Sequence, residues 1–287
     1  MNKKIQCFVC ESTKITTSFK LKTHKIGRCM GCRTYVNMDF NEMLVQETFG
    51  QEYYEKIQSF AFNIERIGKA DPSYEIYLKG LKLLEQMLPD KQSLKRVLDV
   101  GAGYGSFVLT AIDEGWDARG VELSEYAANV AREKNGLPVS GQTLQELLAS
   151  KSEFTAVTLW DVIEHVSGIE AMLAECFQLL SPGGKLLIAT DNFDSLIGDF
   201  SRTLYSTIRW KWPLQRFLIP QNTVYFDIST LELIASRVGF TLRHLEFIDY
   251  PIEKINTNFL QKFILKKLYV WGSRTNRNSQ FLCVFER

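Results

Sequence analysis

The sequence Arg-Val-Leu-Asp-Val-Gly-Ala-Gly-Tyr-Gly-Ser-Phe, at positions 96–107, decides which fold the chain can adopt. Val97, Leu98 and Val100 form the short apolar run that is typical of a buried parallel strand. Three glycines then follow at every second position, where the backbone must reach positive φ and where a Cβ would hold a ligand away from the main chain. The residues from Ser106 onward indicate the first turn of a helix. The stretch therefore predicts a strand, a glycine-rich turn and a helix.

A second apolar strand is expected at 118–123, and Glu122 lies at its end. Strand, helix and strand make a βαβ unit, in which a carboxylate at this place accepts hydrogen bonds from a ribose. The Gly-x-Gly-x-Gly spacing differs from the dinucleotide fingerprint, and Asp99 lies in the strand just before the turn. An acidic strand end suits an ammonium group better than a pyrophosphate. The alternative is a glycine-rich turn that binds no ligand.

The stretch closely resembles motif I of the class I S-adenosylmethionine (SAM)-dependent methyltransferases. The resemblance implies that Asp99, Gly101 and Gly103 flank the methionine part of SAM and that Glu122 binds the ribose hydroxyls. In that family the segment after the third strand lies along the adenine, and this chain has Gln142 and Thr143 there. The residues expected to bind the cofactor are Asp99, Gly101, Ala102, Gly103, Gly105, Glu122, Leu123, Gln142, Thr143 and Asp161.

The segment Asp-Val-Ile-Glu-His-Val, at positions 161–166, directly follows a predicted fourth strand at 156–160. Ligands of parallel sheets bind beyond the carboxyl ends of the strands, so this segment is expected where the methyl group is transferred. If it forms a helix, Asp161, Glu164 and His165 share one face, and their side chains converge on a proton or a divalent metal. These three are the candidate catalytic residues.

The same segment resembles the Glu-His-Val signature of the small-molecule methyltransferases typified by the ubiquinone-biosynthesis O-methyltransferases. That resemblance implies that His165 takes the proton from an attacking hydroxyl, a role that the ordinary pKa of histidine suits. The alternative is structural: Glu164 and His165 cap the helix and hold the end of the sheet together.

The remaining motifs of the family follow in the expected order. A Pro-Gly-Gly turn at 182–184 precedes an apolar strand at 185–190, and 241–250 and 280–285 are expected to form an antiparallel closing pair. The resemblance covers roughly 93–287 and implies an α/β fold with a doubly wound, Rossmann-like sheet of seven strands. Inside this domain, 193–220 is an aromatic and basic insertion. We expect a substrate lid. The alternatives are an acceptor-binding surface, for which contact with lipid is one form, and a packed helical excursion with buried aromatic side chains.

Two Cys-x-x-Cys pairs precede this domain. The eighteen residues between the pairs suit a hairpin that brings four thiolates round one tetrahedral ion. We expect a closed structural zinc ribbon over 1–38, with Cys7, Cys10, Cys29 and Cys32 as the Zn²⁺ ligands. Disulfides and a redox pair are the alternatives; a reducing compartment disfavours the first, and the presence of two pairs disfavours the second.

Between the ribbon and the large domain, 39–92 is predicted to form a helical cap or linker. Its apolar residues recur at helical spacing from Tyr74 to Leu88, and Pro89 ends the pattern. In methyltransferases of this kind an N-terminal helix commonly covers the SAM pocket, which implies that Tyr53 or Tyr54 closes on the ligand.

Composition limits the function classes. The chain has 287 residues and a net charge of +1, which gives no overall attraction to nucleic acid or anionic membrane. The start of the chain lacks a signal peptide's apolar core and no apolar run is long enough for a membrane span, so we expect a cytoplasmic protein. Its oligomeric state stays open.

The expected function is transfer of a methyl group from SAM to an oxygen or carbon of a small-molecule acceptor, such as a phenol, a sugar nucleotide or a natural-product intermediate. One alternative is ribosomal or transfer RNA methylation, with the basic ribbon holding phosphates. Another is a non-catalytic SAM-binding scaffold.

Overall fold

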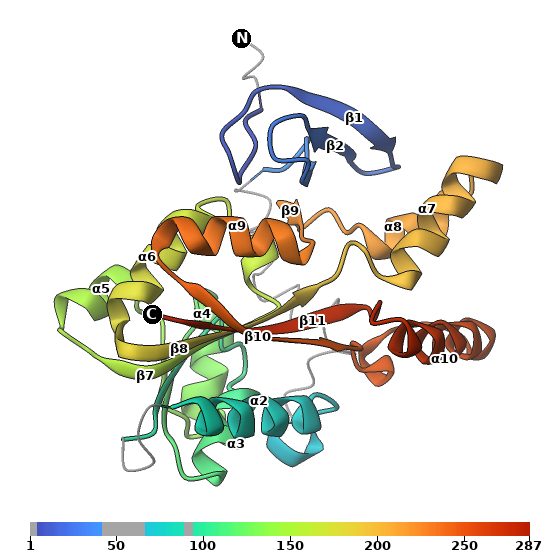
Figure 1. The fold of residues 1–287 in the computed structure, drawn as a ribbon. Helices are drawn as coiled ribbons and strands as arrows, with labels where there is room; N and C mark the ends of the chain where they lie inside the picture. Colours follow the sequence, from blue (N-terminus) through green and yellow to red (C-terminus); the bar gives the residue numbers. More distant parts are fainter. Residues whose placement is uncertain (1–4, 42–66, 89–93) are drawn as a thin grey trace.

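One seven-stranded sheet forms the centre of the protein (Figure 1). The computed structural model describes residues 5–41, 67–88 and 94–287. The strand order is β10-β11-β8-β7-β4-β5-β6, and neighbours are parallel except that β11 runs antiparallel to both β8 and β10. In that order the bounds are Thr241–Ile248, Gln280–Glu286, Leu180–Asp191, Phe154–Trp160, Arg96–Val100, Asp117–Val121 and Val139–Ser140. The predicted doubly wound sheet with an antiparallel closing pair is confirmed.

Two apolar cores cover the two faces of this sheet, as the alternation of side chains along each strand requires. Within β4, Leu98 and Val100 belong to one core and Val97 to the other. The helices α2, α3 and α4 lie on one face, and α5, α6 and α9 lie on the other (Figure 1). Their bounds are Tyr74–Met87, Ser106–Asp113, Glu125–Asn129, Leu144–Ala149, Ile169–Leu179 and Ile228–Val238.

The direction in which the chain crosses the sheet reverses at β4. From β4 the chain continues through β5 and β6 toward one edge, whereas β7 and β8 build the sheet toward the other. The carboxyl ends of β4 and β7 therefore lie side by side with their loops leaving in opposite directions. In open α/β sheets such a switch point is where ligands bind.

The N-terminal ribbon is joined to the large domain by a shared sheet. Its strands β1 (Ile15–Lys20), β2 (Lys25–Cys29) and β3 (Tyr35–Asn37) are completed by β9 (Val224–Tyr225), which comes almost 190 residues later. The Tyr35 ring also stacks on Phe193 with centroids 4.2 Å apart. The ribbon thus packs onto the segment before α9, and its separation as a domain over 1–38 stays a prediction.

The insertion at 193–220 forms two helices, α7 (Leu196–Ile208) and α8 (Lys211–Phe217). Their inner side chains join the ribbon in one small core, which contains Leu21, Ile26, Phe193, Tyr205, Leu214, Leu218 and Tyr225. The packed helical alternative therefore describes the inner face of the insertion. The helix α10 (Phe259–Arg274) packs beside α7, and both stand at the carboxyl edge of the sheet (Figure 1).

The predicted helical cap is described only in part. The helix α2 confirms the apolar stripe that begins at Tyr74, whereas Tyr53 and Tyr54 lie outside the described residues. Across the part of the chain that the structure describes, none of the helices combines the length and apolar character that crossing a bilayer requires.

Candidate active site

The glycine turn after β4 has the backbone that its sequence predicts. Gly101, Gly103 and Gly105 have φ angles of 76°, 51° and 84°, all in the left-handed region. A Cβ on Gly101 would lie 2.5 Å from a methyl carbon of Val162, and one on Gly105 would lie 2.5 Å from Leu137. A Cβ on Gly103 would meet nothing within 4 Å, so this residue presents bare backbone to open space. Gly101 and Gly105 allow close packing, and Gly103 leaves room for a ligand.

Glu122 is tied to this turn through its carboxylate. Oε2 accepts a hydrogen bond from the Gly103 nitrogen at 2.9 Å, and Oε1 accepts one from the Ser124 nitrogen at 2.7 Å. Burial raises the pKa of this carboxyl, and the two backbone donors oppose that rise. The carboxylate is thus fixed beside the turn, and each oxygen has a second lone pair with which to accept from a hydroxyl.

Asp99 is buried beneath the turn. Its Oδ1 accepts a hydrogen bond from the Thr158 hydroxyl at 2.7 Å. Burial raises the pKa of this carboxyl to about 8, and the nearby charge of Glu122 acts in the same direction. A carboxyl in this state binds a cation well, because a positive charge beside it offsets the cost of ionising it in a buried place.

A cavity opens at the switch point, with about 740 Å³ of empty space when the part open to solvent is counted. Of the predicted cofactor residues, those that line it are Asp99, Gly101, Ala102, Gly103 and Asp161. Among the described residues, the lining includes no member of the 193–220 insertion, so its role as a lid stays a prediction.

The other predicted cofactor residues lie outside this lining. Leu123 is 83% exposed, and Gln142 is exposed as well. Thr143 caps α5, where its hydroxyl accepts from the Glu146 nitrogen and the Glu146 carboxylate accepts from the Thr143 nitrogen. The predicted cofactor residues therefore include an enclosed group at the switch point and an exposed group, Leu123, Gln142 and Thr143, beyond β5 and β6.

The cavity also contains a buried polar group that the sequence analysis did not identify. Lys254, in the turn after β10, forms an ion pair with Asp71 at 2.8 Å, and both side chains are almost fully buried. Gln280, at the start of β11, donates from Nε2 to Asp161 Oδ1 at 2.5 Å. The end of β10 and the start of β11 lie at the same edge as the ends of β4 and β7. The rule that ligands bind at this edge was applied only to the parallel strands, and extending it to β10 would have pointed to Lys254.

The segment after β7 differs from the expected helix. Asp161 is left-handed with φ 54°, and only a short 3₁₀ turn follows, at Ile163–His165. The nitrogen and the hydroxyl of Thr223 both bind the Glu164 carbonyl, which fixes the turn against the chain before β9. The expectation that three side chains share one helix face is therefore wrong. Of Asp161, Glu164 and His165, the described cavity lining includes Asp161 alone.

These three ionisable groups have perturbed pKa values. Burial raises the pKa of Asp161 to about 6, and the charge of Lys254 limits the rise. Burial, with the charges of Asp161 and Asp191, raises the pKa of Glu164 well above its usual range, and its Oε2 has no hydrogen-bond partner among the described residues. Burial lowers the pKa of His165 to about 4, so the expectation of an ordinary histidine pKa is not met. Its Nδ1 lies 3.3 Å from the Gln221 carbonyl oxygen.

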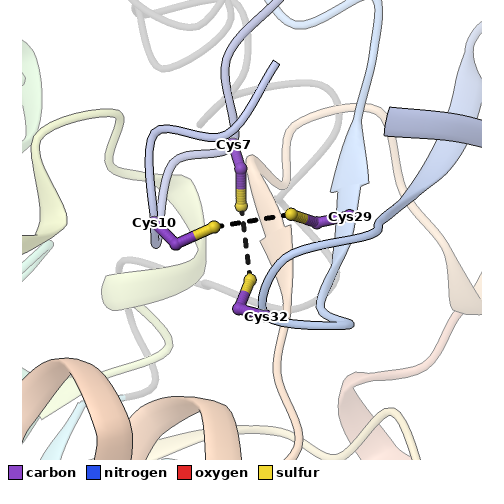
Figure 2. A group of neighbouring side chains, drawn as sticks. All are labelled: Cys7, Cys10, Cys29 and Cys32. Atoms are coloured by element: carbon purple, nitrogen blue, oxygen red, sulfur yellow. Dashed lines mark hydrogen bonds between the residues drawn. The ribbon is translucent and has the colours of Figure 1, made fainter. Parts of the chain in front are cut away.

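The four predicted zinc ligands come together in the ribbon. Their sulfur atoms all lie within 4.8 Å of one another, and Figure 2 shows them pointing at a common centre. The Sγ atoms of Cys7 and Cys32 are 3.5 Å apart, as are those of Cys10 and Cys29. Four thiolates at about 2.3 Å from one tetrahedral ion would be separated by about 3.8 Å. The cluster is therefore compatible with a single zinc ion.

The comparison with protein families agrees with this geometry. A family model described as "Methyltransferase domain" matches residues 74–245, which is more than half of the chain. The chain belongs to the class I SAM-dependent methyltransferases. The matched range covers the glycine turn, Glu122 and the 161–166 segment, and it leaves the ribbon outside.

Curated relatives extend the match. Ubiquinone biosynthesis O-methyltransferase of Coxiella burnetii is 30% identical to this methyltransferase over 192 residues, which are 64% of this chain and 78% of that protein. The protein of the same name from Nitrosococcus oceani is 29% identical over 247 residues, 79% of this chain and 96% of its own.

Solved structures share the fold at lower identity. Magnesium protoporphyrin IX methyltransferase from Synechocystis PCC 6803, with bound SAH, superposes with a TM-score of 0.56 at 14% identity and covers 86% of this chain and 100% of its own. A SAM-dependent methyltransferase from Archaeoglobus fulgidus gives a TM-score of 0.53 at 19% identity, covering 82% and 99%. At these identities the likeness shows the fold alone.

Proposed function

We propose that this methyltransferase moves a methyl group from SAM to an oxygen atom of a small-molecule acceptor, with carbon as the second choice. The observation that carries the proposal is the cavity, because both the glycine turn and the buried acid Asp161 line it. The names of the curated relatives, which are O-methyltransferases of ubiquinone biosynthesis, favour oxygen. A phenol, a sugar nucleotide or a natural-product intermediate would supply the hydroxyl group.

Each part of SAM has a proposed partner. Asp99 and the backbone of Gly101 and Gly103 would hold the methionine part, with the ammonium group offsetting the buried carboxylate of Asp99. Glu122 would accept hydrogen bonds from the ribose hydroxyls. The adenine would lie along the open half of the site, toward Leu123, Gln142 and Thr143, with Ala102 and Gly105 supporting the turn. SAM supplies a methyl group that is activated by its bond to a positively charged sulfur.

Asp161 is the proposed general base. A pKa near 6 leaves its carboxylate ionised at neutral pH and still able to accept a proton, and the nearby charge of Lys254 favours the ionised form. The acceptor hydroxyl would give its proton to this carboxylate as its oxygen bonds to the methyl carbon and the carbon–sulfur bond breaks. The electron pair of that bond stays on sulfur, and S-adenosylhomocysteine (SAH) leaves.

His165 and Glu164 are retained as second candidates. If the His165 Nδ1 carries the proton and donates to the Gln221 carbonyl, Nε2 is the unprotonated nitrogen of the ring, which is the state that a base requires. Its low pKa makes it a weaker base than Asp161. Glu164, protonated by burial, would hold a hydrogen bond instead of removing a proton.

The cysteine cluster is proposed to bind a structural Zn²⁺. Four thiolates complete the tetrahedral coordination of zinc and leave no position for a substrate. The ion would stabilise the ribbon, whose strand β3 pairs with β9 beside the 161–166 segment. Zinc would therefore support the active site through the fold and take no part in the reaction.

The test is methyl transfer from SAM carrying a labelled methyl group to panels of phenols, nucleotide sugars and RNA. We expect label in a small molecule, and a loss of about a hundredfold or more for Asp161→Asn, which keeps the hydrogen bond from Gln280 but removes the base. The exposed Asp113→Asn is the matched control, and it should be fully active. Label in RNA alone would support the RNA alternative, and SAH binding with no transfer to any acceptor would support a scaffold.

A further inference from the structure

The outer face of α10 exposes two neighbouring rows of large apolar side chains. Residues 11 positions apart lie on the same side of a helix, as do residues four apart. One row contains Phe259, Phe263 and Val270, and the next contains Leu260, Ile264 and Trp271. All six are among the exposed large hydrophobic residues, and Phe259 reaches 87% exposure. Such a face is far more apolar than a solvated helix surface requires.

The insertion continues this apolar surface. The helix α7 packs beside α10, and Arg216 of α8 donates to the Asn256 carbonyl at 2.5 Å, in the segment that leads into α10. Phe200, Ile208, Trp210 and Trp212 are exposed here, and the two indole rings stack with centroids 6.3 Å apart. We call the exposed apolar residues of 200–212 and 259–271, together with the basic residues around them, the aromatic–basic face.

Basic residues accompany these apolar rows. The ranges 196–217 and 259–274 hold eight of the chain's 34 basic residues and one of its 33 acidic residues. That one acid, Asp199, is paired with both Arg202 and Arg277. The rest of the chain is net negative, since the whole carries only +1. The positive charge is therefore gathered on the two elements that also expose apolar side chains.

We propose that the aromatic–basic face binds the surface of an anionic lipid bilayer. Exposed Trp, Phe and Leu side chains enter the boundary between head groups and acyl chains, and Lys and Arg beside them attract anionic head groups. A second copy of the chain fits this face poorly, because two strongly positive surfaces would meet. Nucleic acid fits it less well, because Leu260, Ile264 and Val270 add aliphatic surface that neither stacks on bases nor pairs with phosphates.

The position of the face gives membrane binding a consequence for the site. Pro251 and Lys254, in the segment before α10, line the cavity, and the Tyr269 hydroxyl of α10 donates to the carbonyl of cavity-lining Tyr250 at 3.0 Å. The face and the cavity thus share the carboxyl edge of the sheet, where Figure 1 shows α7 and α10. Docking would place the cavity close to the bilayer. The binding itself goes beyond the proposed function and does not depend on it.

The test is flotation of the full chain with vesicles of phosphatidylcholine, or of equal parts phosphatidylcholine and phosphatidylglycerol, at low and high salt. We expect binding to the anionic vesicles only, weakened by salt. The variant Phe259→Ser/Phe263→Ser/Trp271→Ser and the variant Lys266→Glu/Lys267→Glu should each bind at least about tenfold more weakly. The matched controls, Leu94→Ser/Leu233→Ser and Lys134→Glu/Lys151→Glu, alter exposed residues elsewhere and should bind as the unaltered chain does.

An unchanged thermal shift with SAH would show that each variant is folded. Equal flotation of the face variants and the controls would overturn the proposal, as would failure of the unaltered chain to bind anionic vesicles at low salt. Sedimentation without lipid tests whether a second copy of the chain occupies the face. A dimer that the Phe259→Ser/Phe263→Ser/Trp271→Ser variant abolishes would assign the face to that second copy instead.

Discussion

The cysteine cluster and the active-site cavity are built in opposite ways. The cluster takes its four cysteines from two short turns at the ends of one hairpin, and its sulfur atoms lie at a spacing compatible with a metal site. The cavity takes its lining from six separate parts of the chain, between Ile67 and Gln280, and its buried ion pair joins residues 71 and 254. A local site follows from residue spacing, whereas a site at a sheet edge follows from the topology of the whole domain.

The two regions nevertheless touch through β9. This strand pairs with β3 of the ribbon, and the residue before it, Thr223, binds the Glu164 carbonyl. Damage to the ribbon can therefore reach the segment after β7. Substitutions in each region can therefore have a local effect and an effect on the other region, and the variants below distinguish the two.

The largest effect is expected for Cys10→Ser. Three thiolates cannot close the tetrahedral site, and structural zinc contributes about 10–16 kcal/mol of apparent binding free energy in small zinc modules. Elemental analysis should find less than one zinc per chain, and thermal unfolding should begin earlier. The buried Cys176→Ala, outside the cluster, is the control and should keep its zinc. Full zinc content in Cys10→Ser would contradict the ribbon assignment.

A smaller but still large loss of stability is expected for Lys254→Met. Removing one partner of a buried ion pair leaves Asp71 charged and unpaired, which typically costs about 3–5 kcal/mol. The matched control is Lys79→Met, which breaks the exposed pair with Glu246 and should cost less than about 1 kcal/mol. Denaturant unfolding measures both. Equal losses would mean that the cavity pair is no more important than a surface pair.

His165→Ala tests whether the general base is Asp161 or His165. We expect turnover to fall by about tenfold, less than for Asp161→Asn, with SAH affinity unchanged, because the imidazole lies outside the cavity lining and is a weak base. Steady-state kinetics with the identified acceptor would measure this. A loss as large as that of Asp161→Asn would make the imidazole the base.

The smallest effect is a change in pH dependence for Asp99→Asn. The pKa of Asp99 is raised to about 8 in the folded chain, so its contribution to stability is full at low pH and is lost as pH rises through about 8. The ligand-free chain should lose stability between about pH 4 and pH 8. Asp99→Asn should flatten this dependence of the free energy of unfolding on pH, because an amide does not titrate. Denaturant unfolding at several pH values in this range measures the effect. An unchanged pH dependence in Asp99→Asn would mean that burial does not raise the pKa of Asp99.

The same contrast explains how much the sequence could predict. The glycine turn and Glu122 lie within one βαβ unit, and the four clustered cysteines flank one hairpin, so residues that are close in sequence are also close in space. The pairing of Lys254 with Asp71 has no such local spacing, and it could be found only after β10 was placed at the ligand edge. The prediction of a helix at 161–166 was wrong for a similar reason. A helix was expected from local pattern alone, whereas contacts with Thr223, sixty residues later, fix the 3₁₀ turn.

The assignment of catalytic roles is still a prediction for Asp161, Glu164 and His165, as is the use of Gln142 and Thr143 for adenine. The insertion at 193–220 shows both what the sequence could predict and what it could not. Its aromatic and basic content suggested a lid or an acceptor-binding surface, and the structure divides the side chains between a core shared with the ribbon and an exposed outer face. Sequence composition could not tell which aromatic residues belong to which side.

The most direct test of the central claim is calorimetric titration of the chain and of Glu122→Ala with SAM and with SAH. We predict micromolar binding of both ligands to the unaltered chain. Affinity should be about 10–100-fold weaker in the variant, since the ribose hydroxyls lose a charged acceptor and Gly103 loses its partner. The exposed Glu114→Ala should bind as the unaltered chain does. Absence of binding to the unaltered chain, or equal affinity in Glu122→Ala, would contradict the account.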